Sequence, residues 1–193
     1  MKRPYTIILM VSFIFNLGCT DSPRDIMLSD EYLPLHVGNK WYYQTTLGYS
    51  HTIEIIDTVR INGQLFYNTE RKDDRESSSS YYNRYSDEKL YHKIDGHEEI
   101  FFIDFNAPPN EPYDAYQGPM RTMVTLVASH DTLTILGKEF QNVIESYHQL
   151  PDGNNYHSYY VRGIGLAALI WDRENREVKL VRAKIDGKTV FRQ

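Results

Sequence analysis

The chain has 193 residues, a formal net charge of −5, and 41% hydrophobic residues. This composition excludes general disorder, because enough apolar side chains are present to build a core. The acidic balance, with lysine and arginine scattered singly, excludes an interface built on nucleic-acid phosphates, so we expect no nucleic-acid partner.

The start of the chain has the order of an export signal. Lys2 and Arg3 give a positive beginning, residues 7–15 are apolar, and neutral residues lead to Cys19, the only cysteine of the sequence. An apolar run of this length is too short for a membrane-spanning helix, which takes about 20 residues. The Gly18-Cys19 pair resembles the end of the lipobox of bacterial lipoproteins. This resemblance implies that the thiol of Cys19 is the lipidation site and that palmitate is among its acyl chains.

Two other interpretations of this cysteine stay open, namely cleavage near Gly18 without lipid and a buried structural thiol. Thr20 follows the cysteine where many Gram-negative lipoproteins retained in the inner membrane carry aspartate, so the resemblance implies the outer membrane. We expect three parts: a signal peptide at 1–18, a tether at 19–31 and a single β-rich domain at 32–193.

Beyond the tether, short alternating runs separated by turn dipeptides predict strands. Asn62-Gly63, Asp95-Gly96 and Asp186-Gly187 supply the positive φ angles that two-residue hairpin turns require. A longer hairpin loop is expected at 151–155. The pattern predicts about ten strands in a mostly β fold, a single antiparallel sheet that is strongly curved or barrel-like, with hairpin connections and little helix.

The turns also predict strand register. Across Asn62-Gly63, Val59 faces Phe66, and across Asp95-Gly96, His92 faces Glu99. Residues 106–119 contain four prolines, too many for ladder pairing, and are expected to form a long irregular loop, either functional or mobile.

The sixteen tyrosines are the oddity of the composition. Tyr81 and Tyr85 share one face of a strand, whereas Tyr82 points to the other face. One interpretation is a mixture of core and surface rings. The other is an aromatic binding face for a glycan or an elongated apolar ligand, with Tyr81, Tyr85 and Tyr159 as the candidate binding residues.

No convergent reactive set is evident. Around the Asp95-Gly96 turn, the alternation of side chains along the strands leaves His92 and Glu99 on one face as possible zinc ligands. Zinc takes three or four ligands, so we expect no metal site. The oxygen-bearing residues of the proline-rich loop lack EF-hand spacing. The stretch 163–168 fits a dinucleotide fingerprint only superficially, and a glycine-softened bend at the start of a strand is favoured. Ser129-His130-Asp131 are neighbours on an extended chain and point to opposite faces.

Three stretches carry a family resemblance. Residues 32–43, with Pro34-Leu35, Gly38-Asn39 and Trp41-x-Tyr43, resemble the opening of β-rich envelope lipoproteins of unknown function from Bacteroidetes-type bacteria. Residues 137–143 and 160–166 resemble a middle strand and a late Tyr-x-x-Gly-x-Gly-Leu segment of the same group. The resemblance implies a curved antiparallel sheet and no recognised catalytic residues. Within this pattern, we expect Trp41 to be a core anchor.

Together these features predict a lipid-anchored protein of the outer membrane whose β domain binds a ligand or scaffolds an assembly, without catalysis and without a cofactor. The expected partners are the membrane, through the lipid, and a glycan or small apolar ligand. The alternative is a glycan or lipid hydrolase. A retaining glycosidase would need two carboxyl groups about 5–5.5 Å apart, for example among Asp104, Glu111 and Asp114.

Overall fold

A computed structural model describes residues 31–75, 77–117, 120–173 and 175–192. The signal peptide, Cys19 and nearly all of the tether lie outside the described residues. In the described part the chain forms strands and turns and no helix. The strands are β1 (Lys40–Thr45), β2 (Ser50–Ile61), β3 (Gln64–Asp73), β4 (Ser78–Ser86), β5 (Lys89–Lys93), β6 (Ile100–Asp104), β7 (Tyr113–Gln117), β8 (Met120–Ile135), β9 (Lys138–Gln149), β10 (Tyr156–Val161), β11 (Gly165–Trp171), β12 (Glu177–Ile185) and β13 (Lys188–Arg192).

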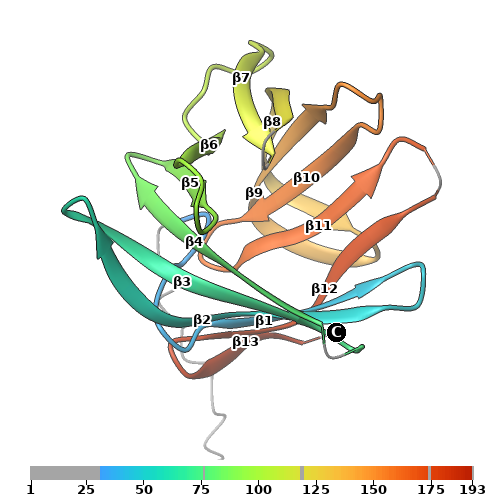
Figure 1. The fold of residues 1–193 in the computed structure, drawn as a ribbon. Coiled ribbons are helices and arrows are strands. Elements are labelled where there is room, and N and C mark those ends of the chain that lie inside the picture. Colours follow the sequence, from blue (N-terminus) through green and yellow to red (C-terminus); the bar gives the residue numbers. More distant parts are fainter. Residues whose placement is uncertain (1–30, 76, 118–119, 174, 193) are drawn as a thin grey trace, which may run out of the picture.

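All thirteen strands belong to one antiparallel sheet that curves almost into a barrel (Figure 1). Strands β1 to β6 follow one another as neighbours, and so do β7 to β12. The two halves join where β1 pairs with β12, and β13 adds to β12. The predicted fold class, a single curved antiparallel sheet with hairpin connections, is confirmed, with thirteen strands instead of about ten.

One seam of the barrel, between β6 and β7, has no ladder pairing. Side chains bridge it instead: the backbone N–H of Asp104 donates to the hydroxyl of Tyr113 at 2.9 Å, and the rings of Phe101 and Tyr113 lie 5.7 Å apart. The sheet is therefore closed by a backbone ladder at every junction except this one.

Two of the three predicted two-residue turns and the longer loop form as expected. Asn62 and Gly63 adopt φ values of 51° and 81°, and Val59 pairs with Phe66 as predicted. The Asp186-Gly187 turn joins β12 to β13. The longer loop at 151–155 joins β9 to β10, also as expected.

The register predicted across Asp95-Gly96 is wrong by one residue. His92 pairs with Ile100, not with Glu99, because the connection spans residues 94–99. A bulge between Leu90 and Tyr91 shifts the ladder by one more residue farther from the turn. The carboxylate of Glu99 instead accepts from the guanidinium of Arg84 at 2.6 Å.

The prediction that residues 106–119 form one irregular loop is also wrong in part. Tyr113–Gln117 forms β7, which pairs with β8 along one edge and faces the seam with the other. Pro108, Pro109 and Pro112 all precede the strand, so none of them removes a donor from its ladder.

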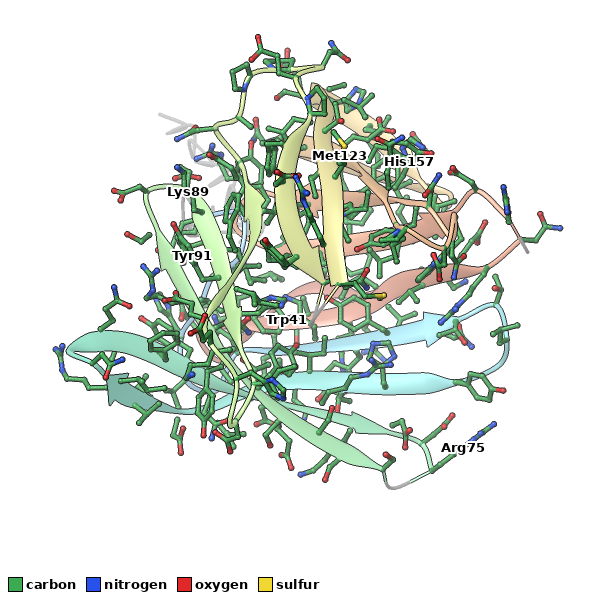
Figure 2. The ribbon with its side chains drawn as sticks, turned by 45° about the horizontal axis from the view of Figure 1, so that its top comes forward. Trp41, Arg75, Lys89, Tyr91, Met123 and His157 are labelled. Carbon is green, nitrogen blue, oxygen red and sulfur yellow. The ribbon has the colours of Figure 1, made fainter. Side chains whose placement is uncertain are left out.

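Trp41 is the anchor of the core, as the sequence predicts, with 1% of its surface exposed (Figure 2). Its indole N–H donates to the carbonyl of Ile164, and the hydroxyl of Tyr43 donates to the carbonyl of Leu166 at 2.9 Å. The first and third stretches that carry the family resemblance therefore meet in space. Gly165, where β11 begins, lies against the indole, in agreement with the expected bend.

No helix within the described ranges has the length and hydropathy needed to cross a membrane.

Candidate functional site

Two of the three candidate tyrosines face the inside of the barrel. Tyr81 and Tyr85 lie on β4 with the buried Asn83 between them on the same face. Tyr159 lies on β10, where alternation directs Tyr160 into the core and Tyr159 to the outer face. The structure therefore brings Tyr81 and Tyr85 to one side of the sheet and leaves Tyr159 on the other.

The interior holds a cavity of about 120 Å³. Its walls come from β1 to β6, from the segment before β1, and from β10 and β11. Most of the lining side chains are apolar or aromatic. They are Leu33, Leu35, Trp41, Tyr43, Ile53, Ile55, Thr69, Tyr81, Asn83, Leu90, His92, Phe102, Tyr160 and Leu166. A cavity of about 150 Å³ with such a lining holds one benzene molecule, so this one, which is close to that volume, suits a single small ring or a chain end.

One part of this lining is polar. The side-chain amide N–H of Asn83 donates to the hydroxyl of Thr69 at 2.7 Å, and both side chains are buried. The amide oxygen of Asn83, Oδ1, has no hydrogen-bond partner among the described residues. A buried acceptor without a partner costs about 1–3 kcal/mol, so this oxygen marks a place where a donor is missing.

The two titratable rings beside this amide are uncharged at neutral pH. Burial raises the pKa of the Tyr81 phenol to about 12 and lowers the pKa of the His92 imidazole to about 4. The rings of Tyr81 and His92 lie 5.6 Å apart, and His92 stacks on Phe102 at 4.3 Å. The cavity is therefore electrically neutral and selects by shape and by hydrogen bonding.

Tyr85 belongs to an aromatic cluster that fills the interior beside the cavity. The Phe105 ring lies 6.1 Å from Tyr85, 5.1 Å from Tyr32 and 5.0 Å from Tyr160. The hydroxyl of Tyr85 donates to the carboxylate of Glu88 at 2.5 Å. Tyr85 is thus held by structural contacts, and Tyr81 is the candidate tyrosine that lines the cavity.

Tyr159 belongs to a polar network on the outer face. Its hydroxyl donates to the carboxylate of Glu145 at 3.3 Å, which also lies 2.8 Å from His157 Nδ1 and 3.2 Å from His130 Nε2. Because Glu145 already has three partners, this network is better suited to holding β8, β9 and β10 together than to receiving a ligand.

A second buried polar group inside the barrel consists of three side chains that bond to one another. Ser146, Ser158 and His148 lie within 2.6–3.1 Å of one another, and each is at most 1% exposed. Burial lowers the pKa of His148 to about 3, so the imidazole stays neutral. Although serine and histidine are catalytic residue types, this trio has no access to solvent, and its hydroxyls are engaged with one another.

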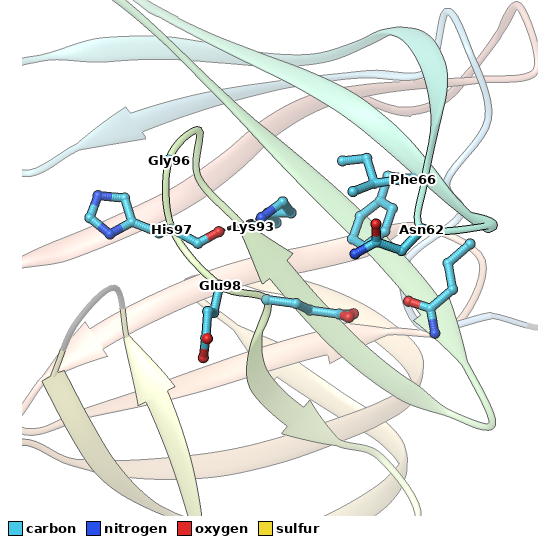
Figure 3. A pocket seen from close by; sticks show the side chains of 9 residues that line it. Asn62, Phe66, Lys93, Gly96, His97 and Glu98 are labelled. Atoms are coloured by element: carbon cyan, nitrogen blue, oxygen red, sulfur yellow. Dashed lines mark hydrogen bonds between the residues drawn. The ribbon is translucent and has the colours of Figure 1, made fainter.

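A further cleft of about 420 Å³ lies between the β2–β3 turn and the β5–β6 turn (Figure 3). Asn62 and Phe66 form one side, and Lys93, Gly96 and Glu98 the other. The ammonium group of Lys93 donates to the carbonyl of His97, which Figure 3 shows as a dashed line. Phe66 is 2% exposed and offers no ring face to a ligand.

Two of the three carboxylates weighed for hydrolysis are engaged in ion pairs. Asp114 is bound by the guanidinium of Arg121 at 2.5 Å, and Asp104 lies 3.3 Å from Lys89. In the part of the chain that the structure describes, no group of three or more histidine, cysteine or acidic side chains is arranged to hold a metal ion.

No family model matches the chain, and no curated protein matches it. Two crystal structures are similar in fold, each with a TM-score of 0.47 and 81% of this chain covered. One is of a protein assigned as a lipoprotein from Parabacteroides distasonis, 10% identical over 99% of that chain. The other is of a protein assigned as exported, with a YmcC-like fold, from Bacteroides fragilis, 12% identical over 100% of that chain. At such identity the likeness concerns the fold alone.

Sequence reasoning missed the residues that define the cavity, Thr69 and Asn83. Their signal was present but faint: each is a polar residue on the strand face that also carries apolar or aromatic neighbours, Tyr67 on β3 and Tyr81 on β4. A polar side chain at a core position is a reason to look for a binding site.

Proposed function

We propose that this chain is an exported, lipid-anchored protein of the bacterial outer membrane whose barrel binds a small apolar ligand without catalysis. The proposed lipid anchor and location rest on the sequence around Cys19. The binding role rests on the cavity, and above all on one observation, the unpartnered amide oxygen of Asn83 inside an apolar chamber.

The chemistry of the chamber defines the ligand. Apolar walls favour a hydrocarbon group, and the free acceptor on Asn83 favours one O–H or N–H donor on that group. Ordered water is a poor occupant, because a buried water makes about three hydrogen bonds and this lining is mostly hydrocarbon. A ring or chain of benzene size that carries one donor satisfies both requirements.

The binding role is tested with phenol and benzene, which have the same ring and differ in the donor. Calorimetric titration of the purified full chain is expected to show binding of both, with phenol about tenfold tighter because of one additional hydrogen bond. Asn83→Leu removes the preference for phenol. Leu90→Phe fills the chamber and weakens both ligands, whereas the matched change Leu65→Phe on the exposed end of β3 leaves them unchanged. Equal, weak binding by every variant would contradict an interior site.

The anchor is tested separately with radiolabelled palmitate in the native host. The wild-type chain is expected to take up the label and to sediment with the outer-membrane fraction. Cys19→Ala is expected to lose both properties. Equal labelling of the two proteins would exclude Cys19 as the lipidation site, without bearing on the cavity.

A further inference from the structure

The outer side of β1, β12 and β13 carries a cluster of positive charges, although the chain as a whole has a net charge of −5. These strands are neighbours in the ladder and lie together in the lower part of the barrel in Figure 1. On β12, alternation with the buried Ala183 directs Arg182 and Lys184 outwards, where both are exposed. The register places Lys40 opposite Lys184, and Arg192 opposite Arg182. These four basic residues form one surface, the basic face.

Both cross-strand pairs of the basic face bring like charges together. Like charges directly opposite each other destabilise a sheet. Neighbouring strands are about 4.8 Å apart and alternate residues about 7 Å apart, so the four side chains are attached within roughly 12 Å of one another. A negative group placed over them would relieve this repulsion.

One carboxylate reaches the basic face, that of Glu54 on β2. It accepts from the ammonium group of Lys40 at 2.7 Å, and this hydrogen bond raises the pKa of Lys40, whereas the positive charge of Arg182 acts against the rise. Within the described ranges, no carboxylate forms an ion pair with Arg182, Lys184 or Arg192. These three charges are therefore uncompensated.

The other carboxylates around the basic face each have a basic residue two positions further along the chain, so each such pair adds no net charge. The pairs are Asp186 with Lys188 in and after the β12–β13 turn, Glu177 with Lys179 on β12, and Glu70 with Lys72 on β3. The basic face therefore keeps a positive local field on a molecule that is negative overall.

The chemistry of the face and the length of the tether favour a membrane as its partner. Tyr42 lies among the cations, with the guanidinium of Arg182 at 3.6 Å and the ammonium of Lys40 at 5.6 Å from its ring centroid. Tyrosine and basic side chains are typical of surfaces that meet lipid headgroups. Cys19 and Glu31 are twelve positions apart, and an extended chain spans at most about 3.5 Å per residue, so a lipid on Cys19 keeps the domain within about 40 Å of the bilayer.

Resting on the lipid anchor proposed above, we propose that the basic face docks on the anionic phosphate groups of the membrane to which the chain is tethered. Phosphates over Arg182, Lys184 and Arg192 supply the negative charge that the surrounding side chains do not. The attraction falls off within the Debye length, about 8 Å at physiological ionic strength, so it acts only when the face lies against the lipid. The contact holds the barrel with β1, β12 and β13 towards the membrane and limits its rotation on the tether.

Docking is tested on the full Cys19→Ala chain, which lacks the lipidation site, by sedimentation with vesicles of phosphatidylcholine, with or without about one third phosphatidylglycerol. Adding Arg182→Gln, Lys184→Gln and Arg192→Gln is expected to weaken binding to the anionic vesicles about a hundredfold, at about fivefold for each lost cation. Binding to the neutral vesicles is expected to stay unchanged, so that any contribution of the apolar residues 7–15 cancels. A salt concentration of about 0.5 M is expected to abolish the difference.

A matched control removes the same charge elsewhere. Arg60, Arg75 and Arg173 are exposed cations outside the basic face. Replacing all three with glutamine in the Cys19→Ala chain is expected to leave binding to the anionic vesicles nearly unchanged. Equal weakening by the two triple variants would show that binding follows net charge alone, and would overturn the proposal.

The stability of a single variant separates docking from a structural role. Lys184→Gln is expected to raise the midpoint of urea denaturation, because it removes the repulsion from Lys40 and deprives no described carboxylate of a partner. A lower midpoint would mean that Lys184 stabilises the fold, and the argument from unrelieved repulsion would fall.

The orientation is tested on the wild-type protein from the native host, bound to the same vesicles, by lysine acetylation and mass spectrometry. Lys184 is expected to react several-fold more slowly on anionic than on neutral vesicles, whereas Lys89, on β5, reacts equally on both. Equal reactivity of Lys184, or binding of heparin by the basic face without binding of anionic vesicles, would overturn membrane docking. If palmitate labelling fails while the hundredfold effect stands, the anchor is wrong and the basic face remains a membrane contact.

Discussion

The tightest contact in the core is between a glycine and an indole. Gly165 adopts a φ of 108°, and a Cβ at this position would lie 3.0 Å from the Trp41 indole nitrogen and 3.3 Å from the side chain of Leu33. Gly165→Ala is therefore expected to lower the free energy of unfolding by about 2–4 kcal/mol, from backbone strain and from displacement of Trp41. Urea denaturation followed by tryptophan fluorescence measures the loss.

The control for this change is Gly48→Ala. Gly48 has a φ of 82° in the exposed β1–β2 turn, and a Cβ there would have no neighbour within 4 Å. Alanine at this position strains the backbone but displaces no neighbouring atom, so the change is expected to lower the free energy of unfolding by about 1 kcal/mol. Equal costs for the two glycines would show that the close approach to Trp41 contributes nothing.

At the scale of single residues, the sequence predicts which side chains are buried better than it predicts what they contact. The Trp41-x-Tyr43 pattern identifies the core face of a strand, because alternate positions share a face. The acceptors of those side chains, the carbonyls of Ile164 and Leu166, lie 123 positions away along the chain. No local pattern carries that information, since it depends on how β1 and β11 are brought together.

At the scale of strands and turns, the local chemistry of a turn predicts a hairpin well only when the turn is tight. Asn62-Gly63 is flanked directly by paired residues, so the predicted register holds. The Asp95-Gly96 turn lies inside a six-residue connection, and a bulge further on shifts the ladder. The sequence could not reveal this, because the energy that sets the register includes the pairing of Glu99 with Arg84 on a third strand.

The seam is the element most open to a direct test. Tyr113→Phe removes the hydroxyl that accepts from the Asp104 N–H across the gap between β6 and β7. One lost hydrogen bond is expected to lower local stability by about 1 kcal/mol and to raise hydrogen exchange of the β6 and β7 amides about fivefold, as measured by mass spectrometry. Tyr116→Phe on the same strand is the control, because Tyr116 is 40% exposed. Unchanged exchange at the β6 edge in Tyr113→Phe would show that the seam is held by other contacts.

At the scale of the molecule, the curved antiparallel sheet is predictable and its closure is not. Hairpins pair strands that are neighbours in the sequence. Ten of the twelve successive strand pairs from β1 to β13 therefore follow from local turns or short connections. Of the other two, the β10–β11 pair depends on a glycine bend, and β6 and β7 are unpaired. Closure requires Lys40 on β1 to meet Lys184 on β12. The cavity depends on this long-range pairing, which is why tyrosine parity placed Tyr81 and Tyr85 on one face of β4 but did not single out Thr69 and Asn83.

Three histidines, two of them in the interior of the barrel and one, His51, partly buried, tie the stability of the fold to pH. Burial is the largest cause that lowers the pKa of His51 and His92 to about 4 and of His148 to about 3, from 6.5 in the unfolded chain. Below pH 6.5 these histidines bind protons in the unfolded chain but stay neutral in the folded barrel. Their contribution to the free energy of unfolding is therefore complete above that pH. It is lost as the pH falls towards the pKa values of the folded state.

Each of these histidines is therefore expected to lower the free energy of unfolding by about 1–2 kcal/mol between about pH 6.5 and pH 5, above the range where most carboxylates titrate. Urea denaturation at steps of pH measures the slope. His92→Gln is expected to reduce the slope by about one third, because glutamine does not titrate. His97→Gln, in the exposed β5–β6 turn, is expected to leave it unchanged. A free energy of unfolding that stays constant over this interval would mean that protonated imidazoles are tolerated inside the barrel, and that its interior is wetter than the apolar lining implies.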